Sequence, residues 1–214
     1  MDNQTAVLEK RGSAAKLSEA RKIIAFYLTH PVVRLLAKTR VAPDVISWSG
    51  LVLTGGAVAL IVTGHLFAAG WVVLLSSFFD TLDGALARHT NQTTRFGAVL
   101  DSTLDRLSEA VLLLGILIFS VLNANERPVM MVSLVSVTMV GSFLVSYVRA
   151  RVEGIGLQCQ VGLFTRAERV VVLVLGLLLS RFDYALITAL SIIAVLSFIT
   201  FGQRLFDAWR QTRS

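Results

Sequence analysis

Apolar stretches of about 20 residues recur along this 214-residue chain, and they restrict the folds open to it. Each is long enough for a helix to cross the hydrocarbon core of a bilayer. The chain is 55% hydrophobic and its mean hydropathy is +0.71, as expected when the surface faces lipid. We predict an all-α membrane protein in which residues 1–214 form a single domain.

The apolar runs predict six transmembrane helices, which we place by residue range. The ranges are 45–63, 70–88, 98–122, 129–150, 168–181 and 184–206. Residues 20–38 mix Arg and Lys with Ile, Phe, Tyr and Leu, a pattern typical of an amphipathic helix that lies along the membrane surface. Residues 1–40 are therefore expected to form a cytoplasmic or interfacial segment that precedes the spans.

Basic residues are distributed unevenly between the connections. If the six spans alternate in direction, only Arg127 and Arg181 of the 20 Lys and Arg residues fall on one of the two sides. The positive-inside rule then places both termini in the cytoplasm, as parts of a multi-pass cell-membrane protein. We attribute the net charge of +6 to this topology and to anionic lipid headgroups rather than to nucleic acid.

Four carboxylates occur at an ordered spacing in the second and third predicted spans. They belong to the pattern D-x2-D-G-x2-A-R-x8-G-x3-D-x3-D, which is formed by Asp80, Asp83, Gly84, Ala87, Arg88, Gly97, Asp101 and Asp105. One Asp at the centre of a transmembrane helix costs about 2.5–3.5 kcal/mol, so ionisable residues within a membrane are functional candidates. The first pair is spaced i, i+3 and the second i, i+4, so each pair shares one helix face.

The short connection between these two spans makes them antiparallel neighbours, so we expect the four carboxylates to converge near the cytoplasmic membrane surface. Like charges this close need compensation, which divalent metal supplies. Oxygen ligands without a nearby His or Cys favour Mg²⁺ or Mn²⁺. Four carboxylates balance two divalent cations, which favours a two-metal site for phosphoryl transfer. The predicted ligands are Asp80, Asp83, Asp101 and Asp105.

Other residues fit a substrate that contains phosphate. Gly84 allows the backbone to approach a ligand closely, and Arg88 can bind a phosphate in bidentate fashion. A second basic set comprises Arg149, Arg151, Arg166, Arg169 and Arg204. This set suits a phosphorylated acceptor, while anchoring at the cytoplasmic membrane surface is the alternative for each member. We expect Arg166 and Arg210 to be anchors.

The segment from Asp80 to Asp105 resembles the signature of the CDP-alcohol phosphatidyltransferase family at every fixed position. Members transfer the phosphatidyl group of a CDP-linked lipid to an alcohol, release CMP and commonly work as homodimers. The resemblance implies a metal-dependent, homodimeric transferase that uses CDP-diacylglycerol. By the same resemblance, the four aspartates hold metal, and Asp105 is also the general base that takes the proton of the acceptor hydroxyl.

The resemblance also implies residues that bind the CDP-lipid. The segment Ala42-Pro43-Asp44-Val45 resembles a T-P-[ND] sequence that members use against the cytidine, with Ala42 in place of Thr. Further positions that match CDP contacts are Gly84, Arg88 and Thr94. From the residues alone, Pro43 and Asp44 fit a helix start equally well, with Pro ending one helix and Asp capping the next.

The acceptor is indicated by three later segments, SYVRARVEGIGL, FTRAERVVVLVLG and GQRL. They resemble the actinobacterial and archaeal branch of the family that uses inositol 1-phosphate and forms phosphatidylinositol phosphate or its archaeal counterpart. By that resemblance, the acceptor phosphate pocket maps onto Arg149, Arg151, Arg169 and Arg204. Glycerol 3-phosphate is the alternative acceptor, giving phosphatidylglycerophosphate. An ion or metal transporter is the remote alternative, because intramembrane carboxylates also line ion pathways.

Overall fold

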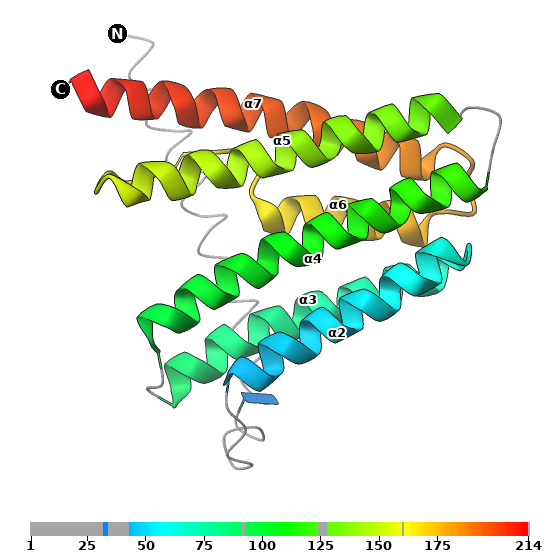
Figure 1. Cartoon of the computed structure of the whole chain (residues 1–214), viewed down its shortest axis with the longest axis horizontal. Coiled ribbons are helices and arrows are strands. Elements are labelled where there is room, and N and C mark those ends of the chain that lie inside the picture. The colour runs from blue at the N-terminus through cyan, green and yellow to red at the C-terminus, as the bar shows by residue number, and fades with distance from the viewer. Residues whose placement is uncertain (1–31, 34–42, 91–92, 124–127, 160, 214) are drawn as a thin grey trace, which may run out of the picture.

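The structure, a computed structural model, describes residues 32–33, 43–90, 93–123, 128–159 and 161–213. It has six helices in these ranges (Figure 1): α2 (Pro43–Val62), α3 (Leu66–His89), α4 (Arg95–Leu122), α5 (Pro128–Gly154), α6 (Arg166–Leu178) and α7 (Ala185–Arg213). Each overlaps one predicted span, which confirms the six helices. The predicted surface helix over 20–38 lies outside the described residues, except for 32–33, which are helical.

Proline, threonine and glycine mark the ends of several helices. Helices α2 and α5 begin at Pro43 and Pro128, where the missing N–H of proline costs no helical hydrogen bond. The side chain of Thr94 caps α4 by accepting a 2.8 Å hydrogen bond from the Gly97 N–H. Between α2 and α3, Gly64 turns the chain with a φ of +82°.

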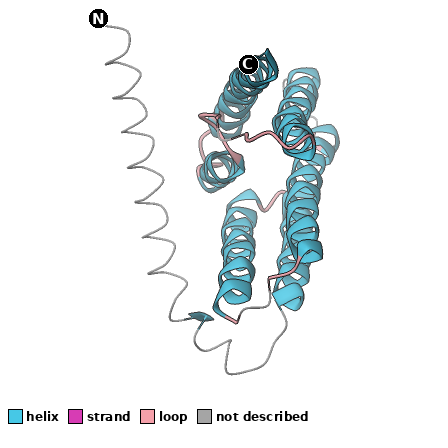
Figure 2. Cartoon of the chain, turned by 90° about the vertical axis from the view of Figure 1, so that its left-hand side faces the viewer, coloured by secondary structure: helices cyan, strands magenta, loops and turns pink. Residues whose placement is uncertain are grey.

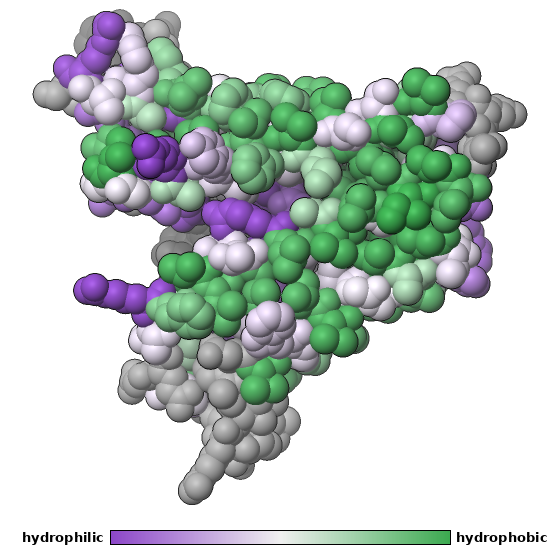
Figure 3. Space-filling view, in the orientation of Figure 1, coloured by the Kyte–Doolittle hydropathy of each residue, from purple (hydrophilic) through white to green (hydrophobic). Residues whose placement is uncertain are grey.

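Four helices are long and apolar enough to cross a membrane, namely α2 from Val45 onward, α3, α5 and α7. Helix α6 has 13 residues and a length of about 20 Å, which is less than the hydrocarbon thickness of about 30 Å. Helix α4 is long enough, but it carries Asp101, Asp105 and Glu109. Large apolar side chains such as Val52 and Phe143 cover much of the outside (Figure 3). The chain is a multi-pass α-helical membrane protein.

The six described helices pack against one another as a bundle. Helix α2 packs against α3 and α4, α4 against α5, α5 against α7, and α6 against both α3 and α7 (Figures 1 and 2). Apolar side chains from all six helices form one core, including Ile61, Val73, Ile116, Leu177 and Leu190.

The start of α6 is recessed within this bundle. Helix α5 extends well beyond it, so the connection after Gly154 runs back along the bundle before α6 begins (Figure 1). A capping box between Thr165 and Glu168 then starts α6. This recess brings the first turn of α6 beside the aspartates of α3 and α4, which defines the candidate site.

Candidate active site

The four predicted aspartates come from α3 and α4, and the structure gives them different surroundings. Asp83 is 4% exposed. Its two carboxylate oxygens accept hydrogen bonds from the Ser47 hydroxyl of α2 and from the Gly84 N–H. Asp101 is exposed and lines the same cavity as Asp83. These two carboxylates therefore face a space that a ligand can enter.

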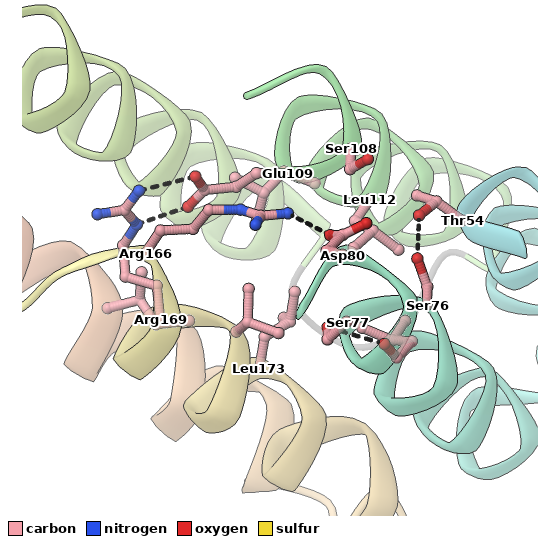
Figure 4. Close-up of a pocket in the computed structure, with 14 residues that line it drawn as sticks. Thr54, Ser76, Ser77, Asp80, Ser108, Glu109, Leu112, Arg166, Arg169 and Leu173 are labelled. Atoms are coloured by element: carbon pink, nitrogen blue, oxygen red, sulfur yellow. Dashed lines mark hydrogen bonds and ion pairs between the residues drawn. The ribbon is translucent and has the colours of Figure 1, made fainter. Parts of the chain in front are cut away.

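The other two aspartates, Asp80 and Asp105, are bridged by one arginine of α6. The two terminal nitrogens of Arg166 lie 2.8 Å from Asp80 Oδ2 and 2.5 Å from Asp105 Oδ1. All three side chains are partly buried. Our interpretation of Arg166 as a surface anchor is therefore corrected: the recessed start of α6 directs this cation at the carboxylates instead. Figure 4 shows its contact with Asp80.

Gly50 of α2 is the other neighbour of Asp80. A Cβ atom added at Gly50 would lie 2.7 Å from Asp80 Oδ1, which is closer than a Cβ atom can approach. A glycine at this position of α2 thus makes room for the carboxylate. Any larger residue there would displace Asp80.

The donor set fits divalent metal, because it consists of carboxylate oxygens with no His or Cys among them. The guanidinium of Arg166 also marks a place between Asp80 and Asp105 where a positive charge is stabilised. Within the described ranges, no three Asp, Glu, His or Cys side chains are close enough to share an ion. Arg166 and Ser47 hold the carboxylates instead, so ion binding requires side-chain rotation here.

A cavity of about 190 Å³ lies beside the connection between α3 and α4, and residues of both helices and Ser47 of α2 line it. It brings together three of the residues predicted to bind the CDP-lipid, together with two of the aspartates; these are Gly84, Arg88, Thr94, Asp83 and Asp101. Arg88 is exposed, and Thr94 also caps α4.

The T-P-[ND]-like segment can be followed only in part. Val45 is exposed near the start of α2. Pro43 and Asp44 form the first residues of that helix, which agrees with the predicted helix start. Ala42 and the side chains of Pro43 and Asp44 lie outside what the structure describes.

A second ion pair lies one helical turn deeper than the first. Arg169 of α6 donates from Nε to Glu109 Oε1 at 2.6 Å and from Nη2 to Oε2 at 2.8 Å (Figure 4). This pair, together with Arg166 and Asp80, lines one cavity of about 20 Å³, which has room for about one water molecule. Glu109 is not among the residues predicted from the sequence to form the site. Its position four residues after Asp105, on the same face of α4, is the signal that could have identified it.

The remaining three arginines predicted to bind the acceptor phosphate are not gathered at one point. Arg149 and Arg151 are exposed at the end of α5, where Arg149 pairs with Glu153 at 2.8 Å. Arg204 is 4% exposed and donates to the carbonyls of Val145 and Val161. Arg204 therefore has partners within the protein, and Arg149 and Arg151 are open to solvent or ligand.

Arg204 belongs to a stripe of α7 side chains that hydrogen-bond the loop between α5 and α6. The stripe consists of Thr200, Gln203, Arg204 and Gln211. Their partners are backbone groups within residues 158–164, at distances of 2.9–3.3 Å. Gly162 packs directly on the stripe, with a φ of +140°. This α7 stripe fixes the loop that leads into Arg166 and Arg169.

A groove of about 390 Å³ lies between α4 and α5. Arg106, Glu109 and Ser142 line it together with apolar residues such as Phe143. Hydrophilic side chains are visible in the hollow between these helices, within an otherwise largely apolar face (Figure 3). Glu109 therefore lies between this groove and the small inner cavity.

Comparison with known proteins places this arrangement in a family. The family model for CDP-alcohol phosphatidyltransferase matches residues 40–202. The phosphatidylinositol phosphate synthase of Mycobacterium tuberculosis is 37% identical over 188 residues, which cover 85% of this chain and 86% of that protein. The archaetidylinositol phosphate synthase of Methanothermobacter thermautotrophicus is 33% identical over 172 residues, covering 79% and 84% of the two chains.

Solved structures agree with these sequence relationships. The M. tuberculosis phosphatidylinositol phosphate synthase with CDP-DAG bound superposes with a TM-score of 0.78 at 36% identity, covering 86% of this chain and 94% of that one. The same enzyme in complex with manganese and citrate also gives 0.78 at 36% identity, with coverages of 85% and 88%.

Proposed function

The chain belongs to the CDP-alcohol phosphatidyltransferase family, and from that membership we propose that it transfers the phosphatidyl group of CDP-diacylglycerol to inositol 1-phosphate. The reaction releases CMP and forms phosphatidylinositol phosphate. Relatives named phosphatidylinositol phosphate synthase support this acceptor, and a solved relative with bound CDP-DAG supports the donor. The observation that carries the proposal is the full family pattern of aspartates on α3 and α4.

The metal ligands in this proposal are Asp80, Asp83, Asp101 and Asp105, which would hold two Mg²⁺ or Mn²⁺ ions. Metal bound there would neutralise negative charge on the donor phosphates and on the leaving CMP. A relative solved with manganese supports metal binding in the family. The position of Arg166 between Asp80 and Asp105 supports a cation at that point.

Asp105 is the proposed general base. Its carboxylate takes the proton of an inositol 1-phosphate hydroxyl while that oxygen attacks the lipid-side phosphorus of the donor. A new phosphorus–oxygen ester bond forms as the bond to the CMP oxygen breaks, and the electron pair leaves with CMP. The Asp105 side chain is 27% exposed and contacts Arg166, so it is partly shielded from water.

The two substrates have separate binding residues in this proposal. Those for the CDP-lipid are Ala42, Pro43, Asp44, Val45, Gly84, Arg88 and Thr94, supported by the cavity that Gly84, Arg88 and Thr94 share. Those for the acceptor phosphate are Arg149, Arg151, Arg169 and Arg204. Arg149 and Arg151 are open to the acceptor, while Arg204 acts through the loop that it holds.

The proposal also includes how the helices lie in the membrane. We place all six helices in the membrane, with α4 and α6 shielded by their neighbours and a surface helix over 20–38 before them. Both termini and the aspartates face the cytoplasm, because most Lys and Arg residues lie on that side. The molecule is a single domain over residues 1–214 and works as a homodimer.

The test is CMP release by the purified protein with CDP-diacylglycerol and Mg²⁺. Inositol 1-phosphate, free inositol and glycerol 3-phosphate are offered separately, with chelator as a further arm. We expect turnover only with inositol 1-phosphate, and none in chelator. Turnover with glycerol 3-phosphate alone would overturn the acceptor and leave the family chemistry in place. Turnover that persists in chelator would overturn the metal site.

A further inference from the structure

Glu109 and Arg169 form a deeply buried ion pair that is joined by two hydrogen bonds. Their side chains are 10% and 2% exposed, which is less than in any other ion pair within the described residues. Two parallel hydrogen bonds, of 2.6 and 2.8 Å, join the guanidinium edge to the two carboxylate oxygens. This side-on arrangement fixes both the position and the plane of the guanidinium.

One nitrogen of Arg169 is left without a partner. Nη1 is buried, and no hydrogen-bond acceptor reaches it within the described part of the chain. Because Nε and Nη2 face Glu109, Nη1 must point away from that carboxylate, as Figure 4 shows. A buried donor without an acceptor is unfavourable, and a guanidinium keeps its charge at any ordinary pH. Nη1 is therefore positioned to donate one hydrogen bond to an anionic oxygen.

The pair also lies beside the reacting groups. Arg169 follows Arg166 by three residues on α6, and Glu109 follows Asp105 by four residues on α4. The inner cavity is lined by Arg166 and Asp80 as well as by Arg169 and Glu109. Glu109, which holds Arg169, is thus about one helical turn from the carboxylate proposed as the base.

Glu109 itself is unsuited to touch such an anion, because two negative charges would repel each other. Its effect must act through the arginine. Without the carboxylate, the long side chain of Arg169 would be free to populate many rotamers, and ordering it would then weaken ligand binding.

We propose that Glu109 is a positioning residue for the phosphorylated acceptor: it holds Arg169 so that Nη1 receives a phosphate oxygen of inositol 1-phosphate. The inference rests on the function proposed above. It assigns acceptor recognition to a pair of residues, one of which never contacts substrate.

The test compares Glu109→Gln with the wild type in the CMP-release assay, varying each substrate in turn. Gln keeps the length of the side chain but places an NH₂ group against one of the arginine nitrogens. We expect the KM for inositol 1-phosphate to rise about ten- to a hundredfold, as for the loss of a hydrogen bond to a charged group. The KM for CDP-diacylglycerol should stay within about twofold, because that site uses other residues. Asp183→Asn, an exposed carboxylate between α6 and α7, is the matched control and should change neither constant.

A second readout separates positioning from folding. Inorganic phosphate should inhibit the wild type competitively against inositol 1-phosphate and inhibit Glu109→Gln more weakly by a similar factor. Arg169→Lys combined with Glu109→Gln should be no worse than Arg169→Lys alone, because both act through one contact.

Each outcome decides between the proposals. An unchanged KM for inositol 1-phosphate in Glu109→Gln, with an active wild type, would overturn the positioning role alone. A rise in both KM values by the same factor would make Glu109 a structural residue and overturn the role as well. A lower melting temperature together with weaker binding of both substrates would do the same. A wild type that turns over no inositol 1-phosphate would instead overturn the proposed function, on which the inference rests.

Discussion

Replacing Arg166 by Gln tests whether this arginine acts as the counter-ion of the carboxylate site. Arg166 joins Asp80 and Asp105 with contacts of 2.8 and 2.5 Å. The Arg166 side chain is 27% exposed and that of Asp80 is 17% exposed, so solvent weakens these contacts only in part. Two charge-assisted contacts, discounted for this exposure, contribute about 2–4 kcal/mol to the free energy of unfolding.

For a chain of this size, about 1 kcal/mol corresponds to about 2–4 °C in the melting temperature. We therefore expect Arg166→Gln to melt about 4–16 °C below the wild type in detergent with chelator present. Saturating Mn²⁺ supplies the missing positive charge, so the difference in Tm should shrink to less than half. The Tm gain produced by Mn²⁺ should accordingly be larger in the variant than in the wild type.

The assay is thermal unfolding of both proteins across a Mn²⁺ titration, which does not depend on turnover. Arg210→Gln removes an exposed arginine near the end of α7 and serves as the control. Its Tm should follow the wild type at every Mn²⁺ concentration. A Tm difference for Arg166→Gln that is equal with and without Mn²⁺ would refute the reasoning, since it would show that Arg166 and metal do not share the same carboxylates.

Two glycines give further predictions. Gly50→Ala places a Cβ atom 2.7 Å from Asp80 Oδ1, so we expect kcat/KM to fall about ten- to a hundredfold from the displaced carboxylate. Gly55→Ala on the same helix meets no atom within 4 Å and should keep wild-type activity; equal losses in the two would contradict this. Gly162→Ala forces a side chain into a φ of +140° and to within 3.0 Å of Arg204 Nε, which should cost about 1–3 kcal/mol of stability. It should raise the KM for the acceptor more than that for the lipid in the CMP-release assay, and the opposite ranking would count against the loop as part of the acceptor site.

The helices and the placement of the α3 and α4 aspartates at one end of the bundle could be predicted because their causes are local. The direct packing of α3 on α4 that the short connection predicted is replaced by packing of both helices against α2. Apolar runs define the helices, and Pro43 and Pro128 mark two of the starts. The connection between α3 and α4 is short, so the aspartates of the two helices had to meet at one end. Periodicity and spacing contain this information directly.

The partners of the α6 arginines could not be predicted in the same way. The contact of Arg166 with Asp80 spans 86 residues, and that of Arg169 with Glu109 spans 60. Both depend on how deeply α6 starts within the bundle, which no local pattern encodes. In the sequence, Arg166 and Arg169 are simply two basic residues among several at the predicted cytoplasmic surface, so anchoring was the natural interpretation of Arg166.

The hydrogen bonds from the α7 stripe also link the site to the order in which the chain is synthesised. A ribosome completes α3 and α4 long before Thr200 and Gln211 leave its exit tunnel. The aspartates can therefore meet early, while the loop that leads into α6 lacks its hydrogen-bond partners until the last helix has entered the membrane. Until α7 is in place, Arg166 and Arg169 therefore follow a loop that lacks the α7 hydrogen bonds seen in the finished structure.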